Sequence, residues 1–119
     1  MKFEDLVKNV TEGERGVQCM VVSAFDGLLI GEWKREDLSF DISALAAEIA
    51  LLLKEMERIS EENGFNRVTE FSFGGTDYFI HVLAVSEEYF LFVVTKETVL
   101  TGKSKFYLRS SAPKLQDIL

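Results

Sequence analysis

The chain has 119 residues, of which 47% are apolar and 28% are charged, and this is the size and composition of one globular domain. A single cysteine and a single histidine exclude an internal disulfide and a cysteine-based zinc site. The net charge of −7 argues against nucleic acid as a partner, because phosphate contacts need a positive protein surface.

The sequence carries no sign of a membrane segment. No apolar run approaches the roughly 20 residues that a membrane-spanning helix needs, and no apolar segment follows the first charged residues as in a signal peptide. We therefore expect one domain over residues 1–119, cytoplasmic and without membrane insertion. Residues 1–95 carry 8 basic and 18 acidic side chains, whereas residues 96–119 carry 5 and 2. This basic segment is typical of a solvated face, with an acidic partner or a membrane surface as the alternative.

The first half of the chain predicts a helix, a β-hairpin and a long helix. Asp26-Gly27 is a strong signal for a two-residue hairpin turn. Asp41 or Ser39 can cap the long helix, and Asn63-Gly64 can close it. The expected elements are a helix over Phe3–Val10, strands over Gln18–Phe25 and from Leu28 to Trp33, and a helix over Asp41–Asn63.

The second half predicts three strands and a final helix. The strands are expected over Arg67–Phe73, Tyr78–Val85 and Tyr89–Thr95. Helical residues then run from Gly102 to Leu119, with a break at Pro113, whose ring removes a backbone hydrogen bond.

These elements predict an α+β protein of order α-ββ-α-βββ-α. Strands that follow one another through short turns form an antiparallel sheet. Three of the five strands are apolar on both faces, so helices are expected on both sides of the sheet. The strand over Arg67–Phe73 is polar enough to lie at an edge, where strands are either protected or used for pairing.

The long helix has a wider apolar stripe than one sheet requires. The centre of the expected stripe repeats at intervals of three and four residues, at Ile42, Leu45, Ile49, Leu52, Met56 and Ile59. Small or apolar side chains at Ala46, Ala50 and Leu53 widen this stripe to about half of the circumference. The excess predicts a second apolar neighbour, such as the same helix of a dimer partner; the alternative is a helix sunk deep in its own core.

The opposite side of this helix is not uniformly polar. Its central side chain is an outward-facing leucine with two alanines and two basic residues around it, which is a candidate protein-docking surface: Ala44, Ala47, Leu51, Lys54 and Arg58. A solvated helix face with one exposed leucine is the alternative.

No catalytic or metal-binding constellation is evident. His81 lies in the middle of a strand and is expected to be a partly buried histidine with its hydrogen bonds satisfied, and Cys19 is expected to be a small core residue. Phosphate-binding loops and nucleophile elbows are absent from the sequence. We expect no enzyme activity, no cofactor and no metal. The arginines that could serve as a GTPase-activating finger carry no positioning signal: Arg15, Arg35, Arg58, Arg67 and Arg109.

The order and spacing of several segments resemble the roadblock (dynein light-chain) domain family over residues 3–119. The short chain with its N-terminal helix is similar to the prokaryotic, MglB-like branch. The matching segments are Gly16–Ser23 with Asp26–Ile30, the helix that opens with Ile42–Glu48, Phe73–Gly75, Tyr78–Val85, Tyr89–Val94 and the final helix from Gly102. Pro113 departs from the family pattern.

The resemblance implies a profilin-like sheet of five antiparallel strands and a dimer. In it the edge strands of two subunits pair and the long helices lie side by side. The interface residues would be Arg67, Val68, Thr69, Glu70, Phe71, Ser72, Ala46, Ala50 and Leu53. The partner subunit would be a second copy or a paralogous roadblock protein.

The resemblance also implies a non-enzymatic regulator that binds a small Ras-like GTPase through Ala44, Ala47, Leu51, Lys54 and Arg58. If it stimulates GTP hydrolysis, it would do so by ordering the GTPase's own residues. The alternatives are an adaptor subunit of a larger motor or signalling complex and, third, a small-molecule sensor, which would need a cavity with converging polar groups.

Overall fold

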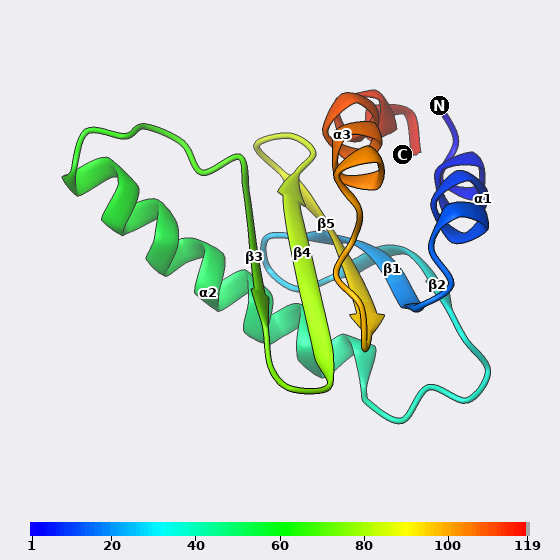
Figure 1. Cartoon of the computed structure of the whole chain (residues 1–119). Helices are drawn as coiled ribbons and strands as arrows, with labels where there is room; N and C mark the ends of the chain where they lie inside the picture. Colours follow the sequence, from blue (N-terminus) through cyan, green and yellow to red (C-terminus); the bar gives the residue numbers. More distant parts are fainter. Residues whose placement is uncertain (119) are drawn as a thin grey trace.

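The computed structural model describes residues 1–118 and has the predicted order of elements (Figure 1). They are α1 (Phe3–Gly13), β1 (Val17–Ala24), β2 (Leu29–Lys34), α2 (Ile42–Glu62), β3 (Glu70–Gly74), β4 (Tyr78–Ala84), β5 (Tyr89–Lys96), α3 (Gly102–Ser111) and the 3₁₀ helix η1 (Ala112–Ile118). The last residue of the predicted final helix, Leu119, lies outside the described residues.

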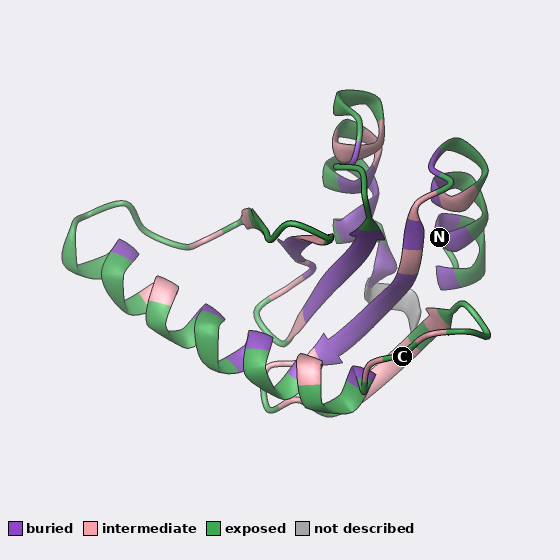
Figure 2. Cartoon of the chain, turned by 60° about the horizontal axis from the view of Figure 1, so that its bottom comes forward, coloured by how far each residue is buried: buried purple, intermediate pink, exposed green. Residues whose placement is uncertain are grey.

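Within residues 1–118, five strands form one antiparallel sheet in the order β2-β1-β5-β4-β3. The central strands β1 and β5 are buried on both faces, as their apolar sequences predict. The sheet therefore separates two cores. One lies under α2, and the other lies under α1, α3 and η1 (Figures 1 and 2).

A turn at Asp26-Gly27 joins β1 to β2, but the connection is longer than the two residues predicted: the Ala24 N–H donates to the Leu28 carbonyl oxygen, and the Gly27 N–H donates to the Ala24 carbonyl oxygen, both at 2.9 Å. Gly27 has a positive φ of 92°, which a glycine adopts at no steric cost. The Leu28 N–H donates a hydrogen bond to Asp26 Oδ1 at 2.9 Å. A Cβ on Gly27 would lie 3.4 Å from the Cα atom of Ala47, so the turn lies directly against α2.

The helix α2 begins at its predicted cap, because Asp41 Oδ1 accepts a hydrogen bond from the Ala44 N–H at 3.2 Å. The prediction of its buried stripe is wrong in part. The buried residues are Ile42, Ala46, Ile49, Ala50, Leu53 and Ser60, whereas Leu45 and Met56 are half-buried and Leu52 and Ile59 are exposed. The second half of α2 extends past the edge of the sheet (Figure 1). A helix that lies tangentially on one sheet buries only about 100° of its circumference, so one flank of the apolar stripe stays outside the core.

The edge strand is shorter than predicted, since it begins at Glu70 instead of Arg67. The chain before it is held to α2: the Ser60 hydroxyl donates to the Asn66 carbonyl at 2.6 Å, and the Val68 N–H donates to Glu57 Oε1 at 3.1 Å. Asn66 has a φ of 66°, a left-handed conformation that asparagine tolerates. Because the segment before Glu70 is bonded to α2, β3 begins to pair with β4 later in the sequence than predicted.

The predicted break in the last helix is confirmed. The α-helix α3 ends at Ser111 and continues as a 3₁₀ helix from Ala112. Pro113 has no N–H to offer the carbonyl of Arg109, so the α-helical hydrogen-bond pattern stops there.

Candidate interaction surfaces

The outer edge of β3 presents backbone groups that no strand pairs with in residues 1–118. The Ala84 N–H donates to the Thr69 carbonyl oxygen at 2.9 Å, and this bond fixes which backbone groups point toward β4. In an antiparallel pair, the residues between the bonded ones turn their N–H and C=O to the other side. The outward groups are therefore those of Glu70, Ser72 and Gly74.

Apolar side chains are exposed on β3 and on the second half of α2, which extends past this edge of the sheet (Figure 1). Ile59 is 46% exposed, Phe73 45% and Leu52 37%. Phe73 stacks on Phe71 with the ring centroids 6.3 Å apart. We call these residues and their half-buried neighbours the edge surface: Leu45, Leu52, Met56, Ile59, Phe71, Phe73 and the outer edge of β3. Such clustering of exposed apolar residues is typical of an interaction site.

Three residues of the predicted dimer interface lie elsewhere. Ala46, Ala50 and Leu53 are buried beneath α2, in the core that this helix shares with the sheet. Their prediction as interface residues is corrected, because a side chain buried in its own chain leaves no surface for a partner. Of the six predicted residues on the edge, Glu70–Ser72 lie in β3, and Arg67–Thr69 lie in the segment before it.

The five residues predicted to bind a partner share the side of α2 that faces away from the sheet. We call this set the outer face: Ala44, Leu51, Lys54 and Arg58 are exposed, as is Ala47 beside the Gly27 turn. Leu51, 66% exposed, is at its centre.

The charge of Arg58 is balanced by its neighbours on the helix. Its guanidinium donates to the carboxylates of Glu55 and Glu62, the latter at 2.9 Å, and these bonds raise the pKa of Arg58. Sequence reasoning missed this pairing, although its i−3 and i+4 spacing was visible. The outer face is therefore an apolar centre with a mixed-charge border, rather than a basic surface.

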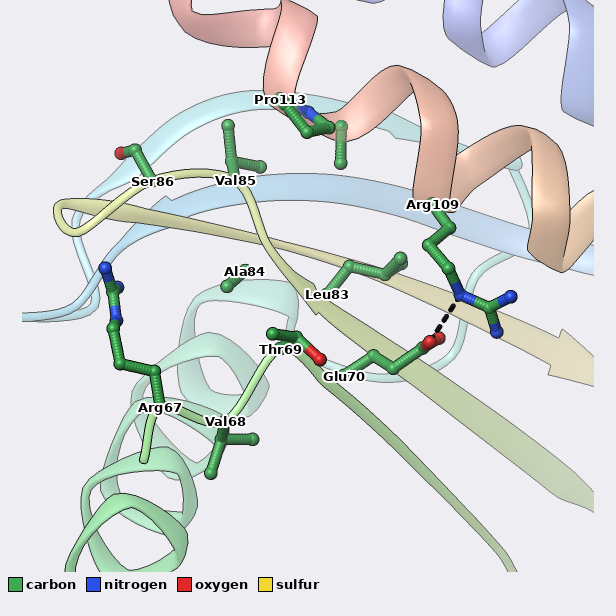
Figure 3. Close-up of a pocket in the computed structure, with 11 residues that line it drawn as sticks. Arg67, Val68, Thr69, Glu70, Leu83, Ala84, Val85, Ser86, Arg109 and Pro113 are labelled. Atoms are coloured by element: carbon green, nitrogen blue, oxygen red, sulfur yellow. Dashed lines mark hydrogen bonds and ion pairs between the residues drawn. The ribbon is translucent and has the colours of Figure 1, made fainter. Parts of the chain in front are cut away.

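A cleft of about 460 Å³ opens where β3 diverges from β4 (Figure 3). Arg67 lies on one side of it and pairs with Glu87 at 3.2 Å. Arg109 reaches from α3 on the other side and donates from Nε to Glu70 at the base of the cleft. Both arginines are thus already matched with carboxylates, so the cleft offers little unbalanced charge to a ligand.

The same Glu70 lies 3.2 Å from His81 Nε2, in the adjacent strand. His81 is only 6% exposed, which is more buried than predicted, and neither of its ring nitrogens makes an aligned hydrogen bond within the described residues. Burial lowers the pKa of His81, Glu70 raises it, and the positive charges of Lys105 and Arg109 lower it, with a net lowering. The expectation of a fully hydrogen-bonded histidine is therefore corrected.

The described residues contain no cluster of side chains suited to a metal ion. No group of three or more histidine, cysteine or acidic side chains is placed to hold a metal ion in this part of the chain. Cys19 is fully buried, and burial raises the pKa of its thiol to about 12, which keeps it protonated and unreactive. In residues 1–118, no helix combines the length and apolar character that a bilayer crossing requires.

Comparison with known proteins places the chain by fold. No family model matches its sequence, and no curated protein matches it significantly. The structure is similar to the gliding protein MglB from Thermus thermophilus, with a TM-score of 0.81 and 16% identity over 97% of this chain and 86% of that one. It is similar to a Roadblock/LC7 domain from Streptomyces avermitilis, with a TM-score of 0.74 and 15% identity over 97% and 98% of the two chains.

The fold of this chain is therefore the roadblock fold, built around an antiparallel sheet with helices on both faces. Within that class it is also similar to MglC from Myxococcus xanthus, with a TM-score of 0.64 and 25% identity over the full length of both chains.

Proposed function

We propose that this chain is a non-catalytic, dimeric platform that binds a small Ras-like GTPase. The observation that carries the proposal is the edge surface, in which outward backbone groups of β3 adjoin exposed apolar side chains of α2 and β3. Unpaired backbone groups and exposed apolar side chains are both unfavourable in a monomer, whereas a strand and a helix of a partner would cover the two together. The similarity in fold to MglB and to Roadblock/LC7 domains supports the same reading.

The subunits would meet by pairing β3 with the equivalent strand of the partner. Glu70, Ser72 and Gly74 would then supply the backbone hydrogen bonds. Ile59 and Leu52 would pack against the partner's long helix, since both lie on the flank of α2 that its own sheet does not cover. A similar MglB has been solved in a tetrameric arrangement, which is consistent with association between such domains. The partner is a second copy, with a paralogous roadblock protein as the alternative.

The outer face of α2 is the proposed contact for the GTPase, because it remains open when the edge surface is covered. Leu51 would supply its apolar centre, with Lys54 and Arg58 on its border.

Activation through an inserted arginine is not favoured by the geometry. The Arg35 side chain donates to the Val17 and Arg15 carbonyl oxygens. Arg58, Arg67 and Arg109 are each paired with carboxylates. An arginine finger must be available to approach the transferring phosphate. The fifth candidate, Arg15, is exposed in the turn before β1. Stimulation of hydrolysis by ordering the GTPase's own residues predicts that Arg15→Ala keeps the stimulation.

The test is a binding and turnover assay with a panel of small Ras-like GTPases loaded with a GTP analogue for binding and with GTP for turnover. The chain is expected to bind one of them, and Leu51→Asp is expected to weaken that binding at least tenfold, because it places a charge in an apolar contact. The matched control is Phe106→Asp, since Phe106 is also 66% exposed but lies on α3, on the other side of the sheet. Unchanged binding by Leu51→Asp would refute the outer face as the contact. Capture of a non-GTPase complex with no GTPase bound would favour an adaptor instead.

A further inference from the structure

A second cavity lies beneath the start of α3, separate from the cleft at the start of β3. Its volume is about 220 Å³. Side chains of β3, β4 and β5 line it on the sheet side, and the segment before α3 lines it from above. Phe79 forms one wall, because its ring fills the space beside Gly74, where a Cβ would come within 2.3 Å of the ring. Val93, Val99 and Leu100 make most of the remaining wall apolar.

The polar residues that line this cavity are Lys105, His81, Ser72 and Thr95. Glu70 lies outside the lining, 3.2 Å from His81 Nε2, and is paired with Arg109. The side chain of His81 is only 7% exposed, and its Nδ1 has no hydrogen-bond partner among the described residues. A buried polar atom without a partner costs free energy unless something satisfies it. The structure thus holds a hydrogen-bonding group beside a positive charge in an otherwise apolar cavity.

The size of the cavity limits what it can hold. A volume of about 220 Å³ is below the range of drug-sized ligand pockets, which begin at about 300 Å³. It has room for about seven groups of the size of a water molecule, at roughly 30 Å³ each. A nucleotide or a peptide of several residues is therefore too large.

We infer that this cavity binds a small monocarboxylate with a short apolar tail. The tail would lie against Phe79 and Val93, and the carboxylate would accept hydrogen bonds from the Lys105 ammonium group and from Nδ1 of His81. The negative charge of the ligand would favour the protonated imidazole, which donates from both nitrogens, with Nε2 facing Glu70. Such a charge-assisted pair of hydrogen bonds would satisfy the buried histidine and offset the positive charge of the lining. This site is on the opposite side of the sheet from the outer face, so it is independent of the proposed GTPase contact.

The test uses hexanoate as the probe and the full chain as the protein. The chain has one histidine, so the ring-proton NMR signals of His81 report on this site alone. Hexanoate is expected to shift them in a saturable way, whereas hexanamide, which lacks the charge, is expected to bind at least tenfold more weakly. Lys105→Gln should reduce the hexanoate affinity at least tenfold.

The matched control is Lys103→Gln, because Lys103 is exposed on the same helix and does not line the cavity. Its hexanoate affinity should stay within twofold of the wild type. The inference is overturned if hexanoate produces no saturable shift, if hexanamide binds equally well, or if Lys105→Gln binds as the wild type does. Circular dichroism is measured on both variants, so that a loss of hexanoate affinity is not mistaken for a loss of folding.

Discussion

At the scale of single residues, Glu14 connects the end of α1 to the start of α3. It is only 7% exposed, and its Oε1 accepts a hydrogen bond from the Thr101 N–H at the start of α3, at 2.9 Å. A carboxylate at a helix N-terminus also interacts favourably with the helix dipole. Burial alone would raise the pKa of Glu14, but hydrogen bonds from Thr101 and Ser104 outweigh it and leave the pKa below its ordinary value of 4.5.

Glu14→Gln is therefore expected to lower the free energy of unfolding by about 2 kcal/mol near pH 7, the scale of a hydrogen bond to a charged group. Because the folded state holds the pKa of Glu14 down, its stabilising contribution is complete above pH 4.5 and is lost as the pH falls through the folded value. Urea unfolding of the wild type and the variant should show a difference that shrinks with acidification. The control is the exposed Glu12→Gln, which should change little. A difference that is constant from pH 7 to pH 3 would contradict this role.

At the scale of elements, the long helix depends on the hydrogen bond at its first residue. Asp41→Ala removes the side-chain oxygen that accepts from the Ala44 N–H. The expected loss is about 1 kcal/mol of unfolding free energy, as for other helix N-caps. Thermal or urea unfolding measures it, with Asp37→Ala in the exposed connection before the helix as the control. Equal effects of the two substitutions would show that the charge matters and the cap does not.

The same helix shows how far the sequence determines the structure. Its cap, its length and its amphipathic character follow from local patterns. The direction of its buried face does not, because Leu45, Leu52 and Ile59 are as apolar as the residues that are buried. Only the placement of the helix across the sheet decides that Ala46 and Ala50 lie inside and Ile59 outside. The interface prediction went wrong at this step: small side chains indicate a close approach, but the approaching element is this chain's own sheet.

The edge strand gives a second example. The polar character of residues 67–73 correctly indicated an edge position. Which backbone groups point outward depends on the register between β3 and β4. That register cannot be predicted from the sequence of either strand alone. The same holds for the contact of Glu70 with His81 and Arg109, which brings together β3, β4 and α3. Tertiary contacts of this kind need the fold before they can be predicted.

At the scale of the whole molecule, the sheet divides the chain into two functional sides. The α2 side carries the edge surface and the outer face, which are the proposed dimer and GTPase contacts. The other side carries α1 and α3 with the basic C-terminal segment and the cavity at His81. The outer face shares no residue with the cavity, so Leu51→Asp should leave hexanoate binding intact. The edge surface, in contrast, adjoins the cavity, because Ser72, Phe73 and Gly74 also line it.

Dimerisation through the edge surface is tested by the solution mass, measured by light scattering at micromolar concentration. Two variants disturb the edge surface in different ways. Ile59→Asp places a charge on an exposed apolar position of α2. Ser72→Pro removes an outward N–H from β3. Phe106→Asp is the control on the other side of the sheet.

We expect a mass of twice 13.5 kDa for the wild type and for Phe106→Asp. Both edge variants should have the mass of one chain, with circular dichroism showing that they remain folded. A wild-type chain that is monomeric at every concentration, or a dimer that survives both edge substitutions, would refute dimerisation through the edge surface.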